Sequence, residues 1–430
     1  MSTLLVTGGQ VLRPDLTVEN ADVLVDQDAG TIEGVGDVGP ADDELDATGG
    51  FVIPGLVNAH THVAMTLLRG YADDKPLDAW LREDIWPVEA ELRAEDVRAG
   101  TELGLVEMIK AGITTFADMY FFMPDVVEAV KTAGMRAVLG YGSITAGKDE
   151  ADARQEMEDG LAFAREYDGA ASGRIRTAFM PHSLTTVGEQ YLREFVPRAR
   201  DLDVPVHFHA NETEAEVDPI VEREGRRPLQ YAADTGLLAP DDFLAHGVHL
   251  TDREIDLLAE RGTGVVHCPA SNMKLASGMA PVQDLLEAGV PVGLGTDGAA
   301  SNNDLDVFDE MRDAAMLGKL AANDASAVDA GSVVRMATAG GADLLGIDAG
   351  RLEAGAKADL AVIDLEAPHL TPATDLVSHL AYAARGSDVR HTVADGQVLM
   401  RDRDVTAFDE RRVRQNAIEH AETLIDRAEQ

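Results

Sequence analysis

Short apolar runs alternate with longer amphipathic runs through the middle of the chain, an arrangement typical of repeated strand and helix units. Eight short runs predict strands, at about residues 51–59, 113–118, 136–142, 175–181, 204–209, 242–247, 263–267 and 290–296. Runs with helical spacing fill the gaps, for example Ala94–Ala111, Pro124–Ala133, Gln190–Arg200 and Val282–Ala288. We therefore expect an α/β protein with a (β/α)8 barrel of the TIM type, whose chemistry lies at the C-terminal strand ends. A doubly wound open sheet is the alternative.

Both ends of the chain carry short β-type runs broken by turn residues. Neither set would be stable alone, so we expect them to pair into one small flanking β-sandwich domain. The predicted boundaries are 1–52 with 350–408 for this domain and 53–349 for the catalytic barrel. Residues 409–430 place apolar side chains at helical spacing and predict a C-terminal helix.

The charge of the chain changes the expected partners. The 430 residues contain 77 acidic and 36 basic side chains, a formal net charge of −41, with acidic residues in every segment. Such a surface repels nucleic acid and anionic membranes, so we exclude both as partners. Screening in high salt would remove the self-repulsion, and we expect activity and folding to weaken when salt is withdrawn.

The cysteine content and the N-terminal sequence indicate in which cellular compartment the protein is expected. Cys268 is the single cysteine, which excludes an internal disulfide and a cysteine-based zinc site. The N-terminus lacks a basic region followed by an apolar core, and no run is long enough to cross a bilayer. We expect a cytoplasmic protein.

Polar side chains gather at the predicted C-terminal strand ends. His60 and His62 end the first strand and share one face, because side chains at i and i+2 of a strand point the same way. Strand five carries His209, and Asp297 follows strand eight. Three imidazoles and one carboxylate suit a single divalent metal, so His60, His62, His209 and Asp297 are the predicted ligands.

A metal of this kind lowers the pKa of a coordinated water to about 7, which supplies a nucleophile at neutral pH. Glu212 lies three residues beyond His209 and is placed to protonate a ring nitrogen of the substrate. We predict that His246 orients the water and takes its proton. Asp297 would accept a proton and pass it to departing ammonia.

The remaining histidines receive structural interpretations. His207 is expected to point away from His209, in the core or behind the metal ligands. His249 and His267 are interpreted as structural rather than catalytic. Four more lie in the flanking region, where we expect surface or packing roles: His369, His379, His391 and His420.

Four long strings resemble the 5'-methylthioadenosine/S-adenosylhomocysteine deaminases of the amidohydrolase superfamily, over nearly the whole chain. They are Pro54-Gly-Leu-Val-Asn-Ala-His-Thr-His62, Leu67-Leu-Arg-Gly-Tyr-Ala-Asp-Asp74, His267-Cys-Pro-Ala-Ser-Asn-Met-Lys-Leu-Ala-Ser-Gly278 and Gly295-Thr-Asp-Gly-Ala-Ala-Ser-Asn-Asn303. The resemblance implies a zinc or iron enzyme, zinc being the first expectation, that converts the adenine amine of a nucleoside to the inosine analogue and ammonia. It also implies that Glu89 accepts the ribose hydroxyls, that His182 contacts the substrate, that Trp80 lines the entrance, and that the protein is a homo-oligomer.

Strand four contains no lysine that could be carbamylated, which agrees with a single metal. The chain departs from its relatives after strand three. Many relatives carry an arginine after strand three, where this chain reads Gly140-Tyr-Gly-Ser-Ile-Thr145. The natural bidentate partner of a substrate carboxylate is therefore missing, and we predict a preference for uncharged 5' groups, as in methylthioadenosine, 5'-deoxyadenosine or adenosine.

Other functions compete with this one. The same metal chemistry serves hydrolases of triazines or halogenated rings and deaminases of guanine or cytosine. Glu89 and His182 discriminate between these functions, because a free base offers no ribose for Glu89. A catalytically dead scaffold conflicts with four intact ligands. The deaminase type with a Pro-Cys-x-x-Cys signature is excluded because Cys268 is alone.

Overall fold

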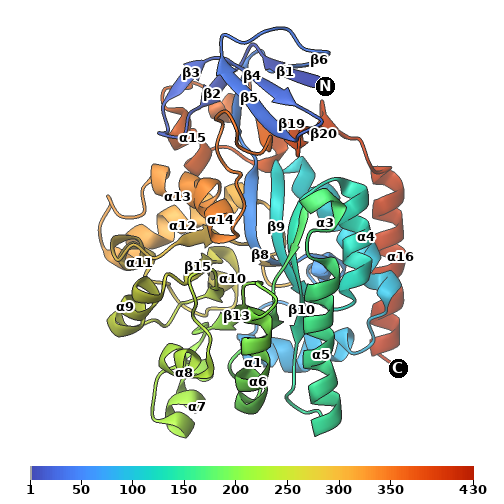
Figure 1. Ribbon diagram of the computed structural model, residues 1–430, viewed down its shortest axis with the longest axis vertical. Coiled ribbons are helices and arrows are strands. Elements are labelled where there is room, and N and C mark those ends of the chain that lie inside the picture. Colours follow the sequence, from blue (N-terminus) through green and yellow to red (C-terminus); the bar gives the residue numbers. More distant parts are fainter. Residues whose placement is uncertain (1) are drawn as a thin grey trace.

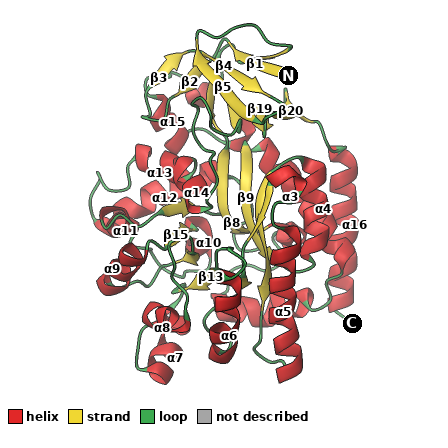
Figure 2. Ribbon diagram, in the orientation of Figure 1, coloured by secondary structure: helices red, strands yellow, loops and turns green. Residues whose placement is uncertain are grey.

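The two ends of the chain form sheets at one end of the molecule, and the long α/β region lies next to them (Figures 1 and 2). The computed structural model describes residues 2–430. Within the α/β region all strand pairings are parallel. The predicted α/β class is confirmed.

The parallel strands fall into two sheets that follow one another along the chain. The first contains β8 (Leu56–His62), β9 (Ile113–Tyr120), β10 (Arg136–Ser143), β11 (Ile175–Thr177), β12 (Met180–Pro181) and β17 (Asp297–Gly298). The second contains β13 (His207–Ala210), β14 (Phe243–His246), β15 (Gly264–His267) and β16 (Val292–Leu294).

Hydrogen bonds on one side and the continuous chain on the other join the two sheets into a ring. Parallel bridges link Phe179 to Val206 and Ser183 to His209, which connects the β12 region to β13. At the other side β17, two residues beyond β16, pairs with β8. Because every strand runs in the same direction, all C-terminal strand ends meet at one face, as a barrel of the TIM type requires.

The first predicted strand, 51–59, is divided in the structure. Residues 51–54 belong to β7, which pairs with β18 in a terminal sheet, whereas β8 begins at Leu56 in the parallel region. Gly55 separates them, and a Cβ there would lie 2.2 Å from the Thr114 hydroxyl oxygen. Only glycine lets the chain pass this close to β9 while it changes sheets.

Sixteen α-helices occur in the described chain. They are α1 (Leu77–Trp80), α2 (Trp86–Glu89), α3 (Ala94–Lys110), α4 (Met123–Ala133), α5 (Glu150–Tyr167), α6 (Glu189–Arg200), α7 (Glu214–Glu224), α8 (Pro228–Thr235), α9 (Asp252–Arg261), α10 (Pro269–Lys274), α11 (Val282–Glu287), α12 (Val307–Ala322), α13 (Ala330–Met336), α14 (Ala339–Leu344), α15 (Leu376–Tyr382) and α16 (Glu410–Ala428). Five short turns of other helical types are η1 (Val63–Leu68), η2 (Leu81–Ile85), η3 (Ala171–Gly173), η4 (Pro368–Leu370) and η5 (Gly386–Asp388). The four helices predicted within the α/β region appear as α3, α4, α6 and α11, with bounds that differ by one residue at most at each end.

Two sheets are built from the ends of the chain. The four-stranded sheet, ordered β5-β4-β1-β6, contains β1 (Thr3–Thr7), β4 (Asp22–Asp26), β5 (Thr31–Gly36) and β6 (Asp43–Asp46). The seven-stranded sheet, ordered β21-β20-β19-β18-β7-β2-β3, contains β2 (Gln10–Leu12), β3 (Val18–Asn20), β7 (Gly50–Pro54), β18 (Leu360–Asp364), β19 (Val389–Ala394), β20 (Gln397–Arg401) and β21 (Asp404–Val405). The second sheet therefore combines strands from both ends, as the pattern predicted.

Helix α16 returns along the outside of the α/β region and packs on α3 (Figure 1). Asp96 of α3 is fully buried at this contact and accepts a hydrogen bond of 2.8 Å from Nδ1 of His420. Arg427 forms an ion pair with the same carboxylate. His420 thus has the packing role that its position predicted.

A buried ion pair joins β10 to the segment before β18. The guanidinium of Arg136 donates to both carboxylate oxygens of Asp359, at 3.2 Å each, and a further bond of 2.9 Å reaches Asp395. The side chains of Arg136 and Asp359 are only 4 % and 0 % exposed. Removing one partner of such a pair leaves an uncompensated charge in a medium of low dielectric constant.

We therefore expect Arg136→Ala to lower the free energy of unfolding by about 3–5 kcal/mol. Urea unfolding at constant salt, followed by tryptophan fluorescence, measures the change. The control is Arg82→Ala, which breaks an ion pair with Asp78 whose side chains are 66 % and 68 % exposed and should cost about 0–1 kcal/mol. Equal losses in the two variants would contradict this account of the buried pair.

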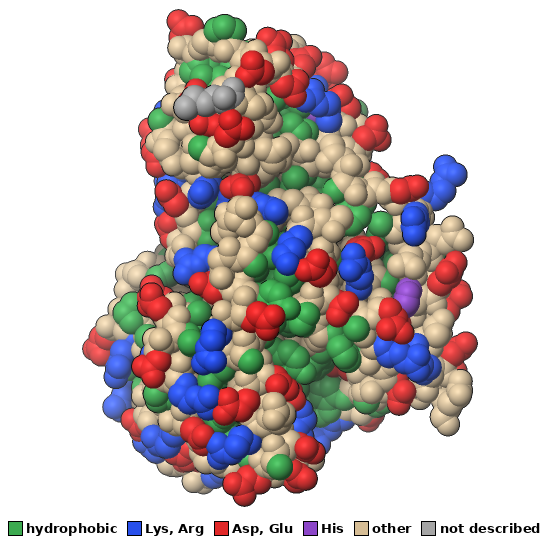
Figure 3. Space-filling model, turned by 45° about the vertical axis from the view of Figure 1, so that its right-hand side comes forward, with side chains coloured by type: hydrophobic (Ala, Val, Ile, Leu, Met, Phe, Trp, Pro, Cys, Tyr) green, Lys and Arg blue, Asp and Glu red, His purple; other side chains and the backbone are tan. Residues whose placement is uncertain are grey.

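Acidic side chains are scattered over the face of the molecule shown in Figure 3, with basic side chains between them. The strongly negative charge is therefore spread over this face. Among the described residues, no helix combines the length and the apolar character that crossing a membrane requires.

Candidate active site

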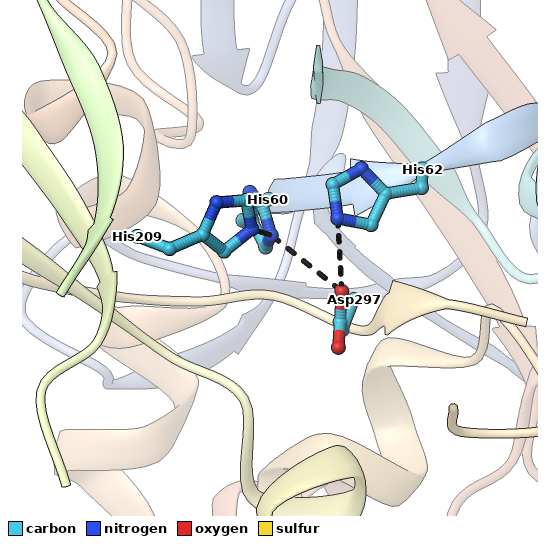
Figure 4. A group of neighbouring side chains, drawn as sticks. All are labelled: His60, His62, His209 and Asp297. Atoms are coloured by element: carbon cyan, nitrogen blue, oxygen red, sulfur yellow. Dashed lines mark hydrogen bonds and ion pairs between the residues drawn. The ribbon is translucent and has the colours of Figure 1, made fainter. Parts of the chain in front are cut away.

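Four side chains from three strands meet at the C-terminal face of the parallel strands. His60 and His62 come from β8, His209 from β13 and Asp297 from β17 (Figure 4). Their nearest candidate ligand atoms all lie within 4.8 Å of one another. Oδ1 of Asp297 is 3.2 Å from Nε2 of His62 and 3.6 Å from Nε2 of His60. The structure thus brings all four predicted ligands together.

A β-bulge in β8 aims the two histidines. The register with β9 shifts between Asn58 and Thr61, where three steps along β8 match two steps from Phe116 to Asp118. One extra residue in a strand reverses the alternation of side chains beyond it. Val57 and Ala59 pack in an apolar cluster that includes Phe243, whose ring stacks on His207 beside the site. They therefore lie on the same side of the sheet as His60 and His62, although their positions are odd and those of the histidines are even.

Hydrogen bonds to carbonyl groups fix which imidazole nitrogen carries a proton. Nδ1 of His62 donates to the carbonyl of Met119 at 2.6 Å, and Nδ1 of His209 donates to the carbonyl of His182 at 2.8 Å. Since a carbonyl oxygen only accepts, both rings hold their proton on Nδ1. In the neutral form of each ring, Nε2 then presents a lone pair to the centre.

His60 reaches the same state through His207. Nδ1 of His207 donates to the carbonyl of Phe243 at 3.0 Å, so Nε2 of His207 accepts, at 2.8 Å, the proton on Nδ1 of His60. The interpretation of His207 as a residue behind the metal ligands agrees with this contact. The expected orientation was wrong, because positions 207 and 209 are two apart on one strand and share a face.

The donor atoms fit a divalent cation. Nε2 of His60 and Nε2 of His209 lie 3.2 Å apart, and both present lone pairs that repel each other unless a positive charge lies between them. Burial lowers the pKa of His60 to about 4 and that of His209 well below its usual value, so both stay neutral. Neutral imidazoles with one carboxylate suit zinc or iron(II).

His62 and Asp297 show that this place attracts positive charge. Burial opposes protonation of His62, but the hydrogen bond and the charge of Asp297 outweigh it and raise the pKa of His62 to about 9. Burial likewise opposes ionisation of Asp297, and contacts with His60 and His62 hold its pKa well below the usual value. A carboxylate that remains ionised in this buried position is a suitable ligand for a cation.

Glu212 and His246 lie beside the four ligands. The ring of His246 stacks 5.5 Å from that of His209, and its Nε2 is 3.6 Å from Oε2 of Glu212. Burial raises the pKa of the Glu212 carboxyl, which favours a form that can donate a proton. Burial lowers the pKa of His246, but the nearby charge of Glu212 outweighs this effect and raises it.

Two of these residues have strained backbones. His246 and Asp297 have φ values of 75° and 58°, in the left-handed region that side chains other than glycine rarely adopt. Such conformations cost on the order of 1–3 kcal/mol and are maintained where the surrounding structure fixes them. His246 lies at the end of the predicted strand 242–247 and Asp297 directly follows the predicted strand 290–296, where chemistry was expected.

Glu89 lies at the end of α2, in the connection between β8 and β9. Its carboxylate accepts a hydrogen bond of 2.7 Å from the hydroxyl of Tyr120, whose ring is 6.1 Å from that of His62. Burial raises the pKa of Glu89 to about 7. One side chain, Tyr120, therefore lies between this carboxylate and the candidate metal ligand His62, a relation that sequence spacing did not show.

His182 and Trp80 differ in their relation to the site. The ring of His182 lies 4.7 Å from that of His209, and its Nδ1 is 3.0 Å from the hydroxyl of Thr186. Trp80 is 4 % exposed and its indole N–H donates to the carbonyl of Ala72. The structure brings His182 to the site, whereas the place of Trp80 at the entrance stays a prediction.

Other histidines have local partners. Nε2 of His249 donates to the carbonyl of Ser277 at 2.7 Å, and His391 is buried in the seven-stranded sheet. His369 contacts Asp388, and His379 bonds within its own helix turn. His267 is buried, and neither ring nitrogen has a hydrogen-bond partner among residues 2–430. These placements agree with structural and packing roles.

His207→Leu should weaken zinc binding about 10- to 100-fold, because it leaves Nδ1 of His60 without the acceptor that orients the ring. Competition with a chromophoric chelator measures the affinity. His267→Leu is the matched control, since it removes an equally buried imidazole that makes no hydrogen bond within the described chain. A similar loss of affinity in both variants would assign the effect to packing alone.

Comparisons with known proteins agree with this site. A model of the amidohydrolase family matches residues 51–399. The chain is 72 % identical to a 5-methylthioadenosine/S-adenosylhomocysteine deaminase from Haloarcula marismortui, with 100 % of both chains covered. It is 46 % identical to a 5'-deoxyadenosine deaminase from Methanosarcina mazei, over 96 % of this chain and 99 % of the relative.

Two solved structures share the fold. An adenosine deaminase from Xanthomonas campestris with bound zinc matches with a TM-score of 0.93 and 37 % identity, over 99 % of each chain. An atrazine chlorohydrolase from Arthrobacter aurescens complexed with zinc matches with a TM-score of 0.90 and 26 % identity, over 97 % of this chain and 100 % of the other. The family model, the relatives of similar length and the converging ligand set lead to one conclusion: this chain belongs to the amidohydrolase family.

Proposed function

We propose that this protein is a metal-dependent deaminase of adenosine-type nucleosides that releases the inosine analogue and ammonia. The candidate substrates are 5'-methylthioadenosine, S-adenosylhomocysteine, 5'-deoxyadenosine and adenosine. The observation that carries the proposal is the position of Glu212 and His246 beside the group of His60, His62, His209 and Asp297. The names of the relatives support the same reaction.

His60, His62, His209 and Asp297 would hold one divalent ion, with Zn²⁺ as the first candidate and Fe²⁺ as the second. The ion would lower the pKa of a water molecule from 15.7 to about 7. We assign a role in proton transfer to each surrounding residue from the contacts that it makes. Glu212 is the proton donor, His246 the first acceptor and Asp297 the second.

The proton transfers balance. Glu212 gives its proton to N1 of the adenine ring while the water oxygen adds to C6. His246 takes one proton of that water at Nε2 and returns it to Oε2 of Glu212, 3.6 Å away. Asp297 takes the second proton and passes it to the amino group, which leaves as ammonia when the bond from C6 to nitrogen breaks.

Substrate recognition is assigned to residues around this centre. Glu89 would accept the ribose hydroxyls, with Tyr120 holding one of its oxygens at 2.7 Å. His182 would contact the substrate from the β12 side, and Trp80 would line the entrance. The segment after β10 lacks an arginine, so we propose a preference for uncharged 5' groups.

The proposal also covers the domain organisation, the oligomeric state, the location and the partner of the protein. The two terminal sheets would form a flanking β-sandwich, with boundaries 1–52 and 350–408 around a 53–349 barrel and a 409–430 helix. We also propose a homo-oligomer and a cytoplasmic location. The partner is a small nucleoside, and nucleic acid and membranes are excluded on the charge of the chain.

The test is ammonia release by the protein loaded with zinc in high salt. The substrates are methylthioadenosine, S-adenosylhomocysteine, 5'-deoxyadenosine, adenosine, adenine and guanine. A chlorotriazine is added, for which chloride release is followed instead, and each substrate is also tested with protein treated with a chelator. We expect turnover of the nucleosides, slower turnover of S-adenosylhomocysteine, and none of the bases. Activity on a base or a triazine with silence on nucleosides would overturn the substrate assignment.

Glu89→Gln sharpens the comparison. A hydrogen bond to a charged group contributes about 1.5–3 kcal/mol, so kcat/KM for a nucleoside should fall about 10- to 100-fold. For the 2',3'-dideoxy analogue the variant should match the unmodified protein. An equal loss on both substrates would remove Glu89 from ribose recognition.

A further inference from the structure

Three polar residues in the segment after β15 each contact a different proposed proton carrier. Ser271 and Asn272 lie in α10, and Ser277 follows it. They are 0 %, 0 % and 6 % exposed. Their partners are Asp297, His246 and Glu212 respectively, which come from three different strand ends.

In each contact the partner uses one polar atom, and its second polar atom faces the other residues of the active site. The hydroxyl of Ser271 donates to Oδ2 of Asp297 at 2.6 Å, while Oδ1 of Asp297 faces the histidines. The hydroxyl of Ser277 donates to Oε1 of Glu212 at 3.3 Å, while Oε2 of Glu212 faces His246. Both carboxylates are therefore held by one oxygen and act through the other.

Asn272 has the same relation to His246. Nδ1 of His246 donates to Oδ1 of Asn272 at 2.9 Å, so the imidazole proton stays on Nδ1. Nε2, which is 3.6 Å from Glu212, is left as the acceptor. Without this bond the ring has no group to choose between its two tautomers or to fix its rotation.

The segment that carries these residues is itself anchored. The ammonium of Lys274 forms an ion pair of 2.6 Å with Asp73 and donates to the carbonyl of Ala300 at 3.1 Å. The backbone N–H of Ala270 donates to the carboxylate of Glu310 at 3.3 Å. His249 holds the carbonyl of Ser277 from the strand β14 side. Anchors on several sides make the segment a rigid support.

We infer that three residues of the segment after β15 position the active site: Ser271, Asn272 and Ser277 orient Asp297, His246 and Glu212 respectively. The inference rests on the proposed deaminase function, since the three partners are its proton carriers. Ser271, Asn272 and Ser277 act through these partners and are positioning residues. Ser301 adds a second hydroxyl to Oδ2 of Asp297 at 2.8 Å, from the segment after β17.

The test compares Ser271→Ala, Asn272→Ala, Ser277→Ala and the conservative Asn272→Asp in the full chain loaded with metal. Loss of a partner behind a metal site or its base typically lowers activity 10- to 100-fold. We expect Asn272→Ala and Ser277→Ala to lower kcat by that factor with KM within twofold and one bound zinc retained. Asn272→Asp keeps the acceptor for Nδ1 of His246. Its decrease in log kcat should be at most half of the decrease that Asn272→Ala shows.

Ser271 differs because its partner is a metal ligand. In the cobalt-substituted protein, Ser271→Ala should shift the visible absorption bands, whereas Asn272→Ala and Ser277→Ala should leave them in place. Met273→Ala is the control within the same helix, since Met273 is 43 % exposed, and it should change neither kcat nor the spectrum.

Unchanged kcat in the alanine variants, or a rise in KM alone, would overturn the inference, as would an equal loss in Met273→Ala. If the unmodified protein deaminates no nucleoside, the proposed function fails. The cobalt spectra would still report whether Ser271 positions Asp297. The two failures are therefore distinguishable.

Discussion

Replacing Glu212 by glutamine should lower kcat about 10²- to 10⁴-fold while the protein keeps its metal. A positioned general acid or base contributes a factor of that size, and glutamine has nearly the same shape but no transferable proton. Glu212 is 7 % exposed, its burial raises the pKa of the carboxyl, and Oε2 lies 3.6 Å from His246. It therefore holds a proton more readily than an exposed glutamate, and it lies close enough to the imidazole to exchange that proton.

Steady-state kinetics on methylthioadenosine, with zinc determined on the same sample, measures this effect. Glu214→Gln is the matched control, because Glu214 lies at the start of α7, two residues away, and is exposed. It should keep kcat within twofold. A Glu212→Gln variant that retained more than a tenth of the original kcat would assign the proton transfer to another residue.

Removing the metal should abolish activity and destabilise the fold. The Nε2 lone pairs of His60 and His209 face each other at 3.2 Å, and without a cation between them this buried contact is unfavourable. A ligand that binds only the folded state stabilises it by about 4 kcal/mol when its free concentration is 1,000 times its Kd. Zinc in excess should therefore raise the thermal midpoint, and a chelator should lower it.

The measurement is a thermal scan and an ammonia assay on protein treated with chelator, then titrated with Zn²⁺ or Fe²⁺ at constant salt. Activity should return with one equivalent of metal. The control is His62→Ala, which should bind the metal more weakly and show a smaller shift of the thermal midpoint. Full activity after chelation, with no bound metal, would refute the proposed chemistry.

The sequence predicted the strand ends at which the candidate active site lies, because that information is local. A parallel strand reads as a short apolar run, and a polar residue directly after it must lie at the C-terminal face of the sheet. His209 and Asp297 were placed by this rule, and the spacing of His60 and His62 added two more ligands. The relatives and the family model then agree with the deaminase resemblance.

Three features could be decided only by the tertiary structure. The division of the first predicted strand depends on the close approach of Gly55 to Thr114, a residue of the neighbouring strand. The direction of His60 depends on a bulge that appears only in the register with β9. The hydrogen bond between Tyr120 and Glu89 joins residues that are 31 positions apart in the sequence.

The three positioning residues also could not be identified from the sequence alone. Serine and asparagine at positions 271, 272 and 277 have no chemistry that distinguishes them from any other polar loop residue, and the sequence marked their segment only as part of a resemblance. Their partners lie 26 to 65 residues away along the chain. The sequence by itself determined the α/β pattern and the candidate metal ligands, since both follow from local periodicity and residue type. Tertiary structure decided the direction of each side chain and its hydrogen-bond partner, since these depend on which distant strand ends meet.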